Sequence, residues 1–213
     1  MLYPIYLDLQ NKKCVVVGGG EVAERKVLSL LQCGAKVVVV SPEATEKLAE
    51  LAMDAQITWQ TREFEPEDLN SAFLVYAATD KPSVNSFVST CAHDYGISLI
   101  NVVDTPDECT FITPSVVARS DLIISVSTSG KSPALAKKIR QQLEKQYGPE
   151  YADFLDILGE ARKVAMDIIP TQKQRQQIFE KLIDDAEIFD LVRAGKKEEA
   201  RKLAMQIVTS ARE

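Results

Sequence analysis

A glycine-rich segment near the start of the chain has the composition of a phosphate-binding turn. Residues 15–23 read VVVGGGEVA, which fits the pattern G-x-G-x-x-A between an apolar run and a helical pattern. Gly18 would permit the tight turn, Gly20 would let a pyrophosphate approach the backbone, and Ala23 would allow close packing of helix on strand. The segment predicts a dinucleotide site, with a purely structural glycine turn as the alternative.

The residues that would meet the adenosine end of such a cofactor follow the second apolar run. The acidic residue expected about 20 positions after the glycines is absent, and Ser41, Pro42 and Glu43 stand there instead. Ser41 can bond a ribose hydroxyl, and Glu43 supplies a carboxylate slightly later. No Lys or Arg lies between Lys36 and Lys47 to hold a 2′-phosphate, so the sequence favours NAD over NADP.

The end of a fourth apolar run offers a second contact to the cofactor. Ala78, Thr79 and Asp80 follow residues 74–77, and ligands of open α/β sheets lie beyond the carboxyl ends of the strands. The small Ala78 would let the backbone approach the ribose. Asp80 also fits as the N-cap of the helix that Pro82 begins, and the two roles are compatible.

Asp104 is the leading candidate for acid–base chemistry. It follows a fifth predicted strand, at the edge where a nicotinamide and its substrate should meet. Because it precedes Thr-Pro, an ordinary turn residue is the alternative. The single histidine, His93, falls inside a predicted helix, which disfavours a histidine proton relay. The sequence has no His/Cys cluster with metal-ligand spacing, and we expect no resident metal.

These residues need a scaffold, and the first half of the chain alternates short β-branched runs with helical patterns. Strands are expected at 14–17, 36–40, 57–59, 74–78 and 98–103, with helices at 21–33, 43–53 and 82–95. This order predicts an α/β fold with a Rossmann-like, doubly wound parallel sheet.

The pattern changes beyond residue 113. Two extended segments, 111–118 and 122–127, precede a helix from Pro133 to about Tyr147, and the remainder is helical, near 150–167, 171–185, 187–193 and 196–211. The sequence predicts three parts. They are a NAD-binding Rossmann-like domain at 1–113, a basic connector at 114–146 and a small all-helical domain at 147–213.

Charge is distributed unevenly over these parts. The 213 residues carry 25 basic and 31 acidic side chains, and the net charge of −6 argues against nucleic acid or an anionic membrane as partner. The net charge is −8 over residues 1–113, +4 over 114–146 and −2 over 147–213. An acidic protein with one basic segment has a particular place for an anion.

Within the basic connector, no carboxylate occurs from Leu122 to Leu143. Hydroxyls, a glycine and a lysine there lead into a helix start, which can offer backbone N–H groups and positive charge to a carboxylate or phosphate. The candidate substrate-binding residues are Thr128, Ser129, Gly130, Lys131, Lys137, Lys138 and Arg140. A well-capped turn between strand and helix is the alternative.

The cysteines and the N-terminus indicate the compartment. Cys14, Cys33, Cys91 and Cys109 show no C-x-x-C spacing, and we expect core thiols rather than disulfides. Residues 1–13 lack a basic segment followed by an apolar one, and no apolar run approaches about 18 residues. The sequence predicts a soluble, cytoplasmic protein.

Five blocks of residues, spread over positions 1 to about 145, resemble a known family. They are GGGEVAERK at 18–26, AATD at 77–80, NVVD at 101–104, FITPS at 111–115 and SGKSPALA at 129–136. The chain is similar to the siroheme synthase N-terminal family, whose members are precorrin-2 dehydrogenases and in some cases also sirohydrochlorin ferrochelatases. Some members carry a fused methyltransferase domain, which we expect this chain to lack.

The resemblance implies NAD-dependent oxidation of the tetrapyrrole precorrin-2 to sirohydrochlorin, by a homodimer in which the connector intertwines. It assigns the pyrophosphate turn to Gly18, Gly20, Glu21 and Val22, the adenosine side to Pro42 and Glu43, and the essential acid–base carboxylate to Asp104. Thr128 stands where the family pattern can have Ser. The basic connector suits a polycarboxylate macrocycle of this kind.

Three further functions stay open. Insertion of ferrous iron as a second substrate needs a group that takes pyrrole protons, and Asp104 could serve without a metal cage. A non-catalytic NAD-sensing module would share the glycine turn but has no use for Asp104 or the basic connector. A small-acid dehydrogenase is disfavoured because the chain lacks a catalytic His and a clear Arg clamp.

Overall fold

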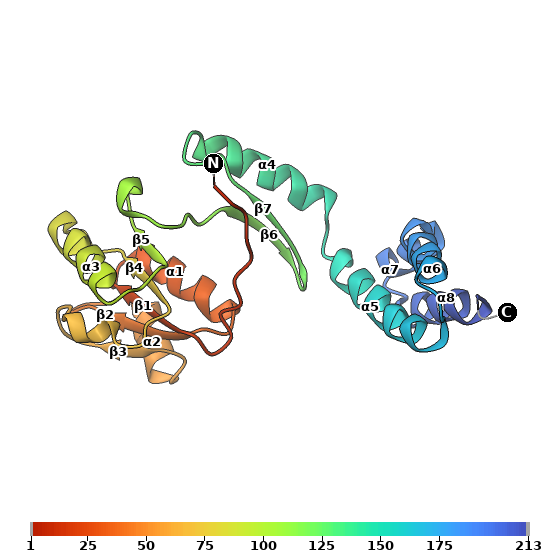
Figure 1. Ribbon diagram of the computed structural model, residues 1–213, viewed down its shortest axis with the longest axis horizontal. Coiled ribbons are helices and arrows are strands. Elements are labelled where there is room, and N and C mark those ends of the chain that lie inside the picture. Colours follow the sequence, from red (N-terminus) through yellow and green to blue (C-terminus); the bar gives the residue numbers. More distant parts are fainter. Residues whose placement is uncertain (1, 212–213) are drawn as a thin grey trace. The chain divides into compact units, whose positions relative to one another are not determined.

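Five short strands in the first half of the chain pair as one parallel sheet. They are β1 (Lys13–Val17), β2 (Lys36–Val40), β3 (Thr58–Gln60), β4 (Leu74–Ala77) and β5 (Ile100–Val102). Their order in the sheet is β3-β2-β1-β4-β5 (Figure 1). The order reverses between β1 and β4, which is the topological switch point of a Rossmann-like fold. The predicted doubly wound sheet is therefore confirmed.

The computed structural model describes residues 2–211, which form two units that divide between Thr113 and Pro114. Helices cover both faces of the sheet in the first unit. The helices are α1 (Glu21–Gln32) and α2 (Glu46–Met53) on one face and α3 (Pro82–Asp94) on the other, together with short 3₁₀ turns at Pro66–Leu69 and Pro106–Glu108.

Strand β1 shows why the sequence reads as a continuous apolar run. Cys14 and Val16 pack into the core on the α1–α2 face, whereas Val15 and Val17 pack into the core on the α3 face. All four side chains are buried, because a parallel strand covered on both faces has no solvent side.

The start of α2 and the exposure of Cys33 differ from the prediction. Helix α2 begins at Glu46 and not at Glu43, because the Thr45 hydroxyl caps it by accepting from the Leu48 N–H at 3.3 Å. Residues 41–44 are therefore loop. Cys33 is exposed because it directly follows the last residue of α1, so the expectation of a core thiol was wrong there.

All four cysteines are free. Cys14 and Cys91 are buried, and burial raises the pKa of the Cys14 thiol to about 11.

The second unit begins with an antiparallel hairpin of β6 (Ser115–Arg119) and β7 (Leu122–Val126), a pairing the sequence did not reveal. Helix α4 (Pro133–Gln146) packs against both strands. The remaining helices, α5 (Glu150–Ile168), α6 (Gln172–Asp184), α7 (Ala186–Arg193) and α8 (Lys197–Ser210), enclose a core of their own. No helix within residues 2–211 combines the length and apolar composition needed to cross a membrane.

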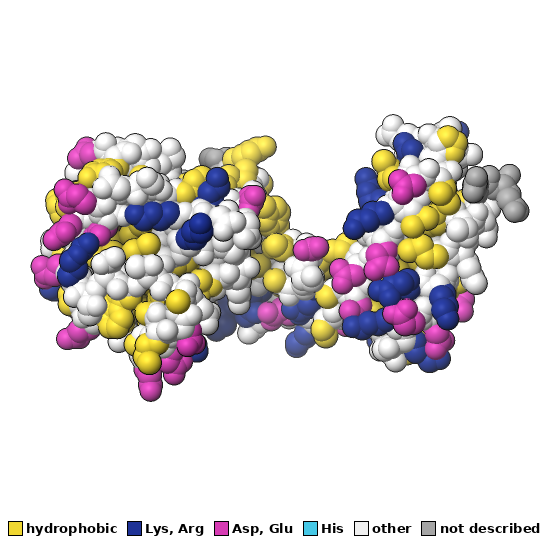
Figure 2. Space-filling model, turned by 90° about the horizontal axis from the view of Figure 1, so that it is seen from below, with side chains coloured by type: hydrophobic (Ala, Val, Ile, Leu, Met, Phe, Trp, Pro, Cys, Tyr) yellow, Lys and Arg dark blue, Asp and Glu magenta, His cyan; other side chains and the backbone are white. Residues whose placement is uncertain are grey.

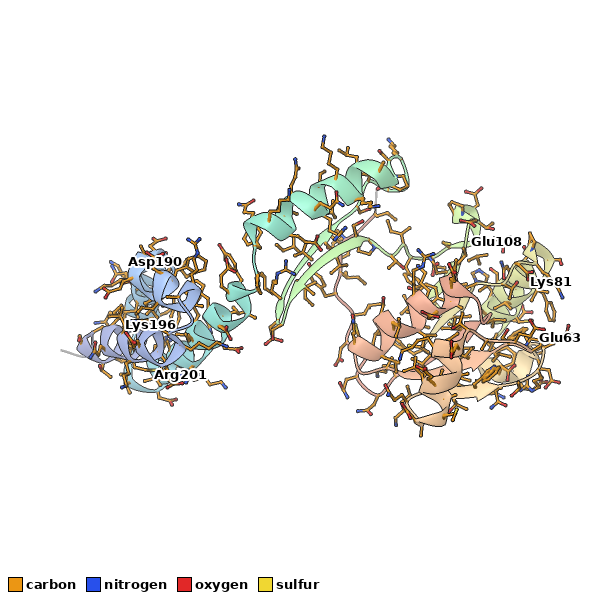
Figure 3. All side chains as sticks on the ribbon, turned by 180° about the vertical axis from the view of Figure 1, so that it is seen from behind. Glu63, Lys81, Glu108, Asp190, Lys196 and Arg201 are labelled. Carbon is orange, nitrogen blue, oxygen red and sulfur yellow. The ribbon has the colours of Figure 1, made fainter. Side chains whose placement is uncertain are left out.

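The surface of helices α5–α8 mixes both signs of charge. Basic and acidic side chains are interspersed on the face shown in Figure 2. Arg201, labelled in Figure 3, pairs with Glu160 at 2.7 Å, and Lys197 pairs with Asp153 at 2.6 Å. Because acidic and basic side chains are interspersed and partly paired, this face carries no patch of one charge.

Candidate cofactor and substrate site

A cavity of about 1070 Å³ opens at the carboxyl edge of the parallel sheet. This edge is where ligands of doubly wound sheets bind, and the volume lies just above the usual range for small-molecule sites. Every residue predicted to bind the cofactor lines it, namely Gly18, Gly20, Glu21, Val22, Ser41, Pro42, Glu43, Ala78, Thr79 and Asp80. Asp104 lines the same cavity.

The three glycines of the turn serve different purposes. Gly18 has a φ of +123°, and a Cβ there would collide with the carbonyl oxygen of Ala78. A Cβ on Gly19 would collide in the same way with the carbonyl oxygen of Glu43. Gly20 differs, since its φ is −82° and a Cβ would find no atom within 4 Å. The first two positions let the chain approach itself, and the third leaves open space for a ligand.

Helix α1 presents its N-terminus to this open space. Gly20 is the N-cap and has no side chain with which to cap, and the first internal bond of the helix runs from the Glu24 N–H to the Gly20 carbonyl at 2.9 Å. The preceding N–H groups, on Glu21, Val22 and Ala23, are free to meet an anion. The turn and the helix together fit the pyrophosphate of a dinucleotide.

The loop after β2 is anchored at both ends. The Ser41 carbonyl accepts a hydrogen bond from the Trp59 indole at 2.9 Å, and the Thr45 N–H donates to the Gly19 carbonyl at 2.9 Å. This places Pro42 and Glu43, both exposed, beside the glycine turn. The loop therefore suits the adenosine side of a cofactor.

The turn after β4 is held by Asn85, which sequence reasoning did not find. The buried Asn85 amide oxygen accepts from the Thr79 N–H at 3.0 Å and from the Thr79 hydroxyl at 2.7 Å, and its NH₂ donates to the Thr79 carbonyl at 3.1 Å. The N-cap of α3 is Lys81, whose N–H donates to the Thr79 hydroxyl at 3.2 Å. The prediction that Asp80 caps α3 was therefore wrong, and its exposed carboxylate faces the cavity instead.

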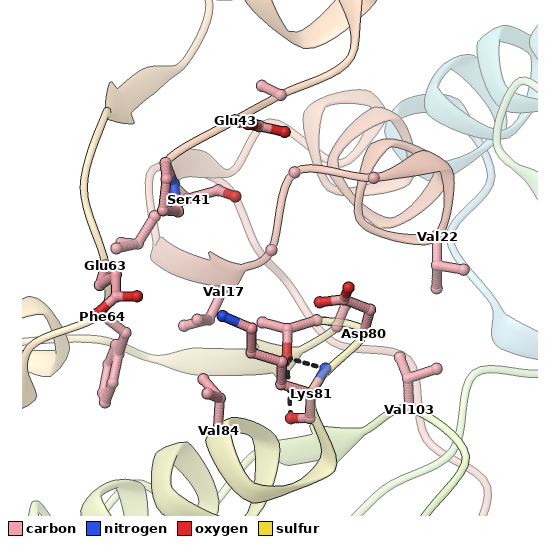
Figure 4. A pocket seen from close by; sticks show the side chains of 18 of the residues that line it. Val17, Val22, Ser41, Glu43, Glu63, Phe64, Asp80, Lys81, Val84 and Val103 are labelled. Carbon is pink, nitrogen blue, oxygen red and sulfur yellow. Dashed lines mark hydrogen bonds between the residues drawn. The ribbon is translucent and has the colours of Figure 1, made fainter.

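Other lining residues were missed because they come from loops and a helix with no sequence motif. Figure 4 shows Glu63 and Phe64 at one end of the cavity and Val22 and Val103 at the other. Phe64 meets Phe87 of α3 edge-on, with 5.9 Å between ring centroids. The cavity thus has one end beside β2 and β3 and another beside β5.

The charge lining the cavity is mostly negative. The lining residues include five carboxylates, on Glu21, Glu43, Glu63, Asp80 and Asp104, and one ammonium, on Lys81. The excess of negative charge disfavours an additional phosphate on the adenosine ribose, which agrees with the prediction of NAD over NADP.

Asp104 occupies a strained turn directly after β5. Its φ of +60° lies in the left-handed region, which costs a non-glycine residue of this kind on the order of 1 kcal/mol. The Cys109 thiol fastens the turn, since it accepts from the Val102 N–H at 3.2 Å and can donate to the Thr105 carbonyl at 3.4 Å. The Asp104 carboxylate is exposed and makes no hydrogen bond or ion pair with another residue of 2–211. It is free to exchange a proton with a ligand.

The predicted substrate-binding residues of the connector lie in the second unit, around the start of α4. Their turn is satisfied internally, because the Thr128 hydroxyl accepts from the Ser132 N–H at 3.1 Å and the Ser132 hydroxyl caps α4. Arg140 pairs with Glu144. The remaining cations, Lys131, Lys137 and Lys138, are exposed and form no ion pair in the described chain. Binding by Thr128, Ser129, Gly130 and these cations stays a prediction.

Comparison with known proteins gives three consecutive family matches. A model described as "Putative NAD(P)-binding" matches residues 5–115, one described as "Sirohaem biosynthesis protein central" matches 119–146, and one described as "Sirohaem synthase dimerisation region" matches 150–207. The first model alone covers more than half of the chain.

Curated relatives and a solved structure agree with these matches. The chain is 41% identical over 209 residues to "Siroheme synthase" of Methylobacillus flagellatus, which covers 98% of this chain and 44% of that protein. It is 39% identical over 201 residues to "Siroheme synthase 1" of Aeromonas salmonicida, covering 94% and 43%. The chain therefore spans less than half the length of these relatives. A structure titled "SirC, precorrin-2 dehydrogenase" superimposes with a TM-score of 0.76 at 27% identity and covers 96% of this chain and 100% of that one.

Proposed function

Because this chain belongs to the siroheme synthase family, we propose that it is an NAD-dependent precorrin-2 dehydrogenase that forms sirohydrochlorin. The observation that carries the proposal is the single cavity that joins the uncapped start of α1, the loop after β2 and the free carboxylate of Asp104. A cofactor seated there would extend from the glycine turn toward the acid–base group.

In this proposal, the chain's own groups bind and orient the cofactor. The free N–H groups at the start of α1 receive the pyrophosphate, and the open face of Gly20 lets it come close. Ser41 and Glu43 bond the adenosine ribose, and the Asn85 clamp holds the Thr79 turn in place. When bound, NAD supplies the acceptor for a hydride.

Asp104 supplies the acid–base chemistry in this proposal. Oxidation of precorrin-2 removes a hydride and a proton, so a base must accept the proton as the hydride leaves. Asp104 lines the cavity and directly follows Val103, which Figure 4 shows at the end remote from Glu63 and Phe64. Its unpartnered oxygens can accept that proton without breaking an existing bond.

The decisive experiment replaces Asp104 by asparagine, which keeps the size and tolerates a left-handed backbone. Formation of sirohydrochlorin from precorrin-2 and NAD is followed by absorbance, and NAD binding is followed by calorimetry. We expect kcat to fall at least 100-fold with unchanged NAD affinity. Wild-type protein that binds NAD but does not oxidise precorrin-2 would reject the proposed function in favour of a sensing module.

Ferrous iron is a second substrate that the same carboxylate could serve, because Asp104 is exposed in a wide cavity and unpaired. Siroheme formation from sirohydrochlorin and ferrous iron, measured without NAD, tests this activity. A rate equal to that of a protein-free control would remove it.

The assembly proposed for this enzyme is a homodimer. The support is the match of residues 150–207 to a sirohaem synthase dimerisation region. Sedimentation of the purified protein gives the test, and a mass near 23.6 kDa at micromolar concentration would contradict it.

A further inference from the structure

Lys26 on α1 is a half-buried ammonium without a counter-charge. Its Nζ lies 5.1 Å from the centroid of the Tyr76 ring and 3.5 Å from the Thr113 hydroxyl, and no carboxylate of residues 2–211 pairs with it. Elsewhere in the first unit, Lys47 and Arg62 do pair with carboxylates. The isolation of Lys26 is notable because residues 1–113 have a net charge of −8.

The surroundings make an unpaired ammonium unfavourable. Burial lowers the pKa of Lys26 most, the neighbouring Arg25 lowers it further, and the nearby Cys109 only partly opposes them. The Tyr76 ring partly stabilises the charged form of Lys26, because an aromatic face attracts a cation. The Thr113 hydroxyl can satisfy at most one of the three N–H donors. A carboxylate that binds here would stabilise the charged form of Lys26 without having to break an existing ion pair.

The cluster around Lys26 is built firmly on the α1 side of β4 and β5. Tyr76 and Asn101 are opposite one another in the sheet register. The Asn101 amide donates to the Phe111 carbonyl at 2.9 Å, and the Phe111 ring meets Tyr76 edge-on at 5.5 Å. The Tyr76 hydroxyl and the Thr113 hydroxyl share a hydrogen bond of 2.9 Å. These contacts fix the surface over which the ammonium sits.

This surface continues the Asp104 end of the cavity. Val22 lines the cavity and lies one turn before Lys26 on the same face of α1, a rise of about 6 Å. Val103, which precedes Asp104, packs on the same α1–α2 face of the sheet. Figure 4 shows Val22 and Val103 at one end of the cavity. A macrocycle that reaches Asp104 would therefore carry its peripheral groups toward Lys26.

We propose that Lys26 binds a carboxylate of the tetrapyrrole substrate and so positions the macrocycle over Asp104. The proposal rests on the proposed function, since that function supplies a polycarboxylate substrate. It makes Lys26 a substrate-binding residue within the otherwise acidic first unit, in addition to the cations predicted in the connector.

Steady-state kinetics of Lys26→Met, Lys26→Arg and Lys12→Met test the proposal. Lys12 is the matched control because its ammonium also lies over an aromatic ring, Phe73, at 5.4 Å, but it precedes β1 at the amino edge of the sheet. We expect Lys26→Met to raise the KM for precorrin-2 about ten-fold or more, with kcat, the KM for NAD and the Tm nearly unchanged. Lys26→Arg should restore most of the affinity, and Lys12→Met should behave as wild type.

The outcomes separate this inference from the proposed function. If wild type turns over and Lys26→Met has an unchanged KM for precorrin-2, Lys26 has no part in binding and the function stands. Lys26 is also excluded from substrate binding if Lys26→Arg does not restore the affinity for precorrin-2, or if Lys26→Met lowers only kcat or Tm. In these cases Lys26 is structural and the proposed function stands. Wild type without turnover and without binding of sirohydrochlorin would overturn both.

Discussion

Replacing Gly20 by aspartate should stabilise the cofactor-free protein and greatly weaken its binding of NAD. Gly20 is the N-cap of α1, where a side-chain oxygen could accept from the first-turn N–H groups. Its φ of −82° suits any residue, and a Cβ there meets no atom within 4 Å. The wild-type glycine therefore leaves an available cap unused.

The expected gain in the free energy of unfolding follows from three small contributions. Aspartate is better than glycine as an N-cap by a few tenths of a kcal/mol, its charge at the helix start adds about 0.3–1 kcal/mol, and removal of a glycine from the unfolded chain adds about 0.4–1 kcal/mol. Repulsion from Glu21 and Glu24 in the first turn subtracts part of this. We expect a net gain of about 1 kcal/mol and a rise in Tm of about 3–5 °C.

The same change should weaken NAD binding at least 100-fold. The new carboxylate would accept a hydrogen bond from an N–H that the pyrophosphate needs. It would also place an additional negative charge beside the phosphates. Hydrogen bonds to a charged group contribute about 1.5–3 kcal/mol. Thermal unfolding without cofactor and calorimetric titration with NAD measure the two effects.

Gly18→Ala is the control for this prediction. Its φ of +123° and the collision with the Ala78 carbonyl should destabilise the fold by several kcal/mol. An NAD affinity within ten-fold of wild type would show that the start of α1 is not the pyrophosphate site, and a lower Tm for Gly20→Asp would contradict the gain expected from capping.

Three further predictions concern an ion pair of the first unit, the Asn85 clamp and the choice of cofactor. Burial raises the pKa of Asp68, but its hydrogen bonds from Arg62 and a backbone N–H lower it more, so the net pKa lies below the usual value. The pair's stabilisation is therefore complete at neutral pH and is lost as the pH falls through that lowered pKa. Arg62→Leu should lower the free energy of unfolding at pH 7, and this loss should shrink as the pH falls through the lowered pKa of Asp68; an equal loss at every pH in denaturant unfolding would contradict this. Asn85→Ala should raise the KM for NAD about 5–10-fold by releasing Thr79, and an unchanged KM would show that the clamp is dispensable. Wild type should prefer NAD to NADP at least ten-fold, and Glu43→Gln should narrow that ratio; a preference for NADP would refute the assignment of the acidic wall.

The sequence predicted the parts of the fold that are set by local pattern. The run 14–17 is apolar at every position because β1 is covered on both faces, and this pattern identifies a central parallel strand. The residues that line the cavity could be predicted because the carboxyl ends of parallel strands meet at one edge, so that Ser41, Thr79 and Asp104 converge although they are far apart in the chain.

The remaining features depend on contacts between distant segments. Phe64 and Phe87 reach the cavity from a loop and from α3, and no spacing in the sequence links them. Asn85 acts through three hydrogen bonds to a single residue, which a list of residue types does not reveal. The expected cap at Asp80 was wrong because hydrogen bonds of Thr79 with Asn85 and Lys81 order that turn instead.

Three residues near the carboxyl edge of the sheet each carry an unfavourable local feature. Gly20 leaves a helix uncapped, Lys26 is a half-buried cation without a carboxylate, and Asp104 holds a left-handed backbone. Each feature lowers stability, and such features gather where function requires them. Their location at one edge is a physical argument for the site that does not depend on any motif.

The strain at Asp104 can be separated from its chemistry. Asp104→Gly should raise the free energy of unfolding only slightly, because glycine adopts a φ of +60° freely but adds entropy to the unfolded chain, while dehydrogenase activity is lost. Ser71 has the same φ in the loop that precedes β4, at the opposite edge of the sheet, and lies outside the cavity. Ser71→Gly should give a similar gain in denaturant unfolding with wild-type activity. If Asp104→Gly were instead less stable than wild type, its side chain would be holding the turn, and the reason for an aspartate there would be structural.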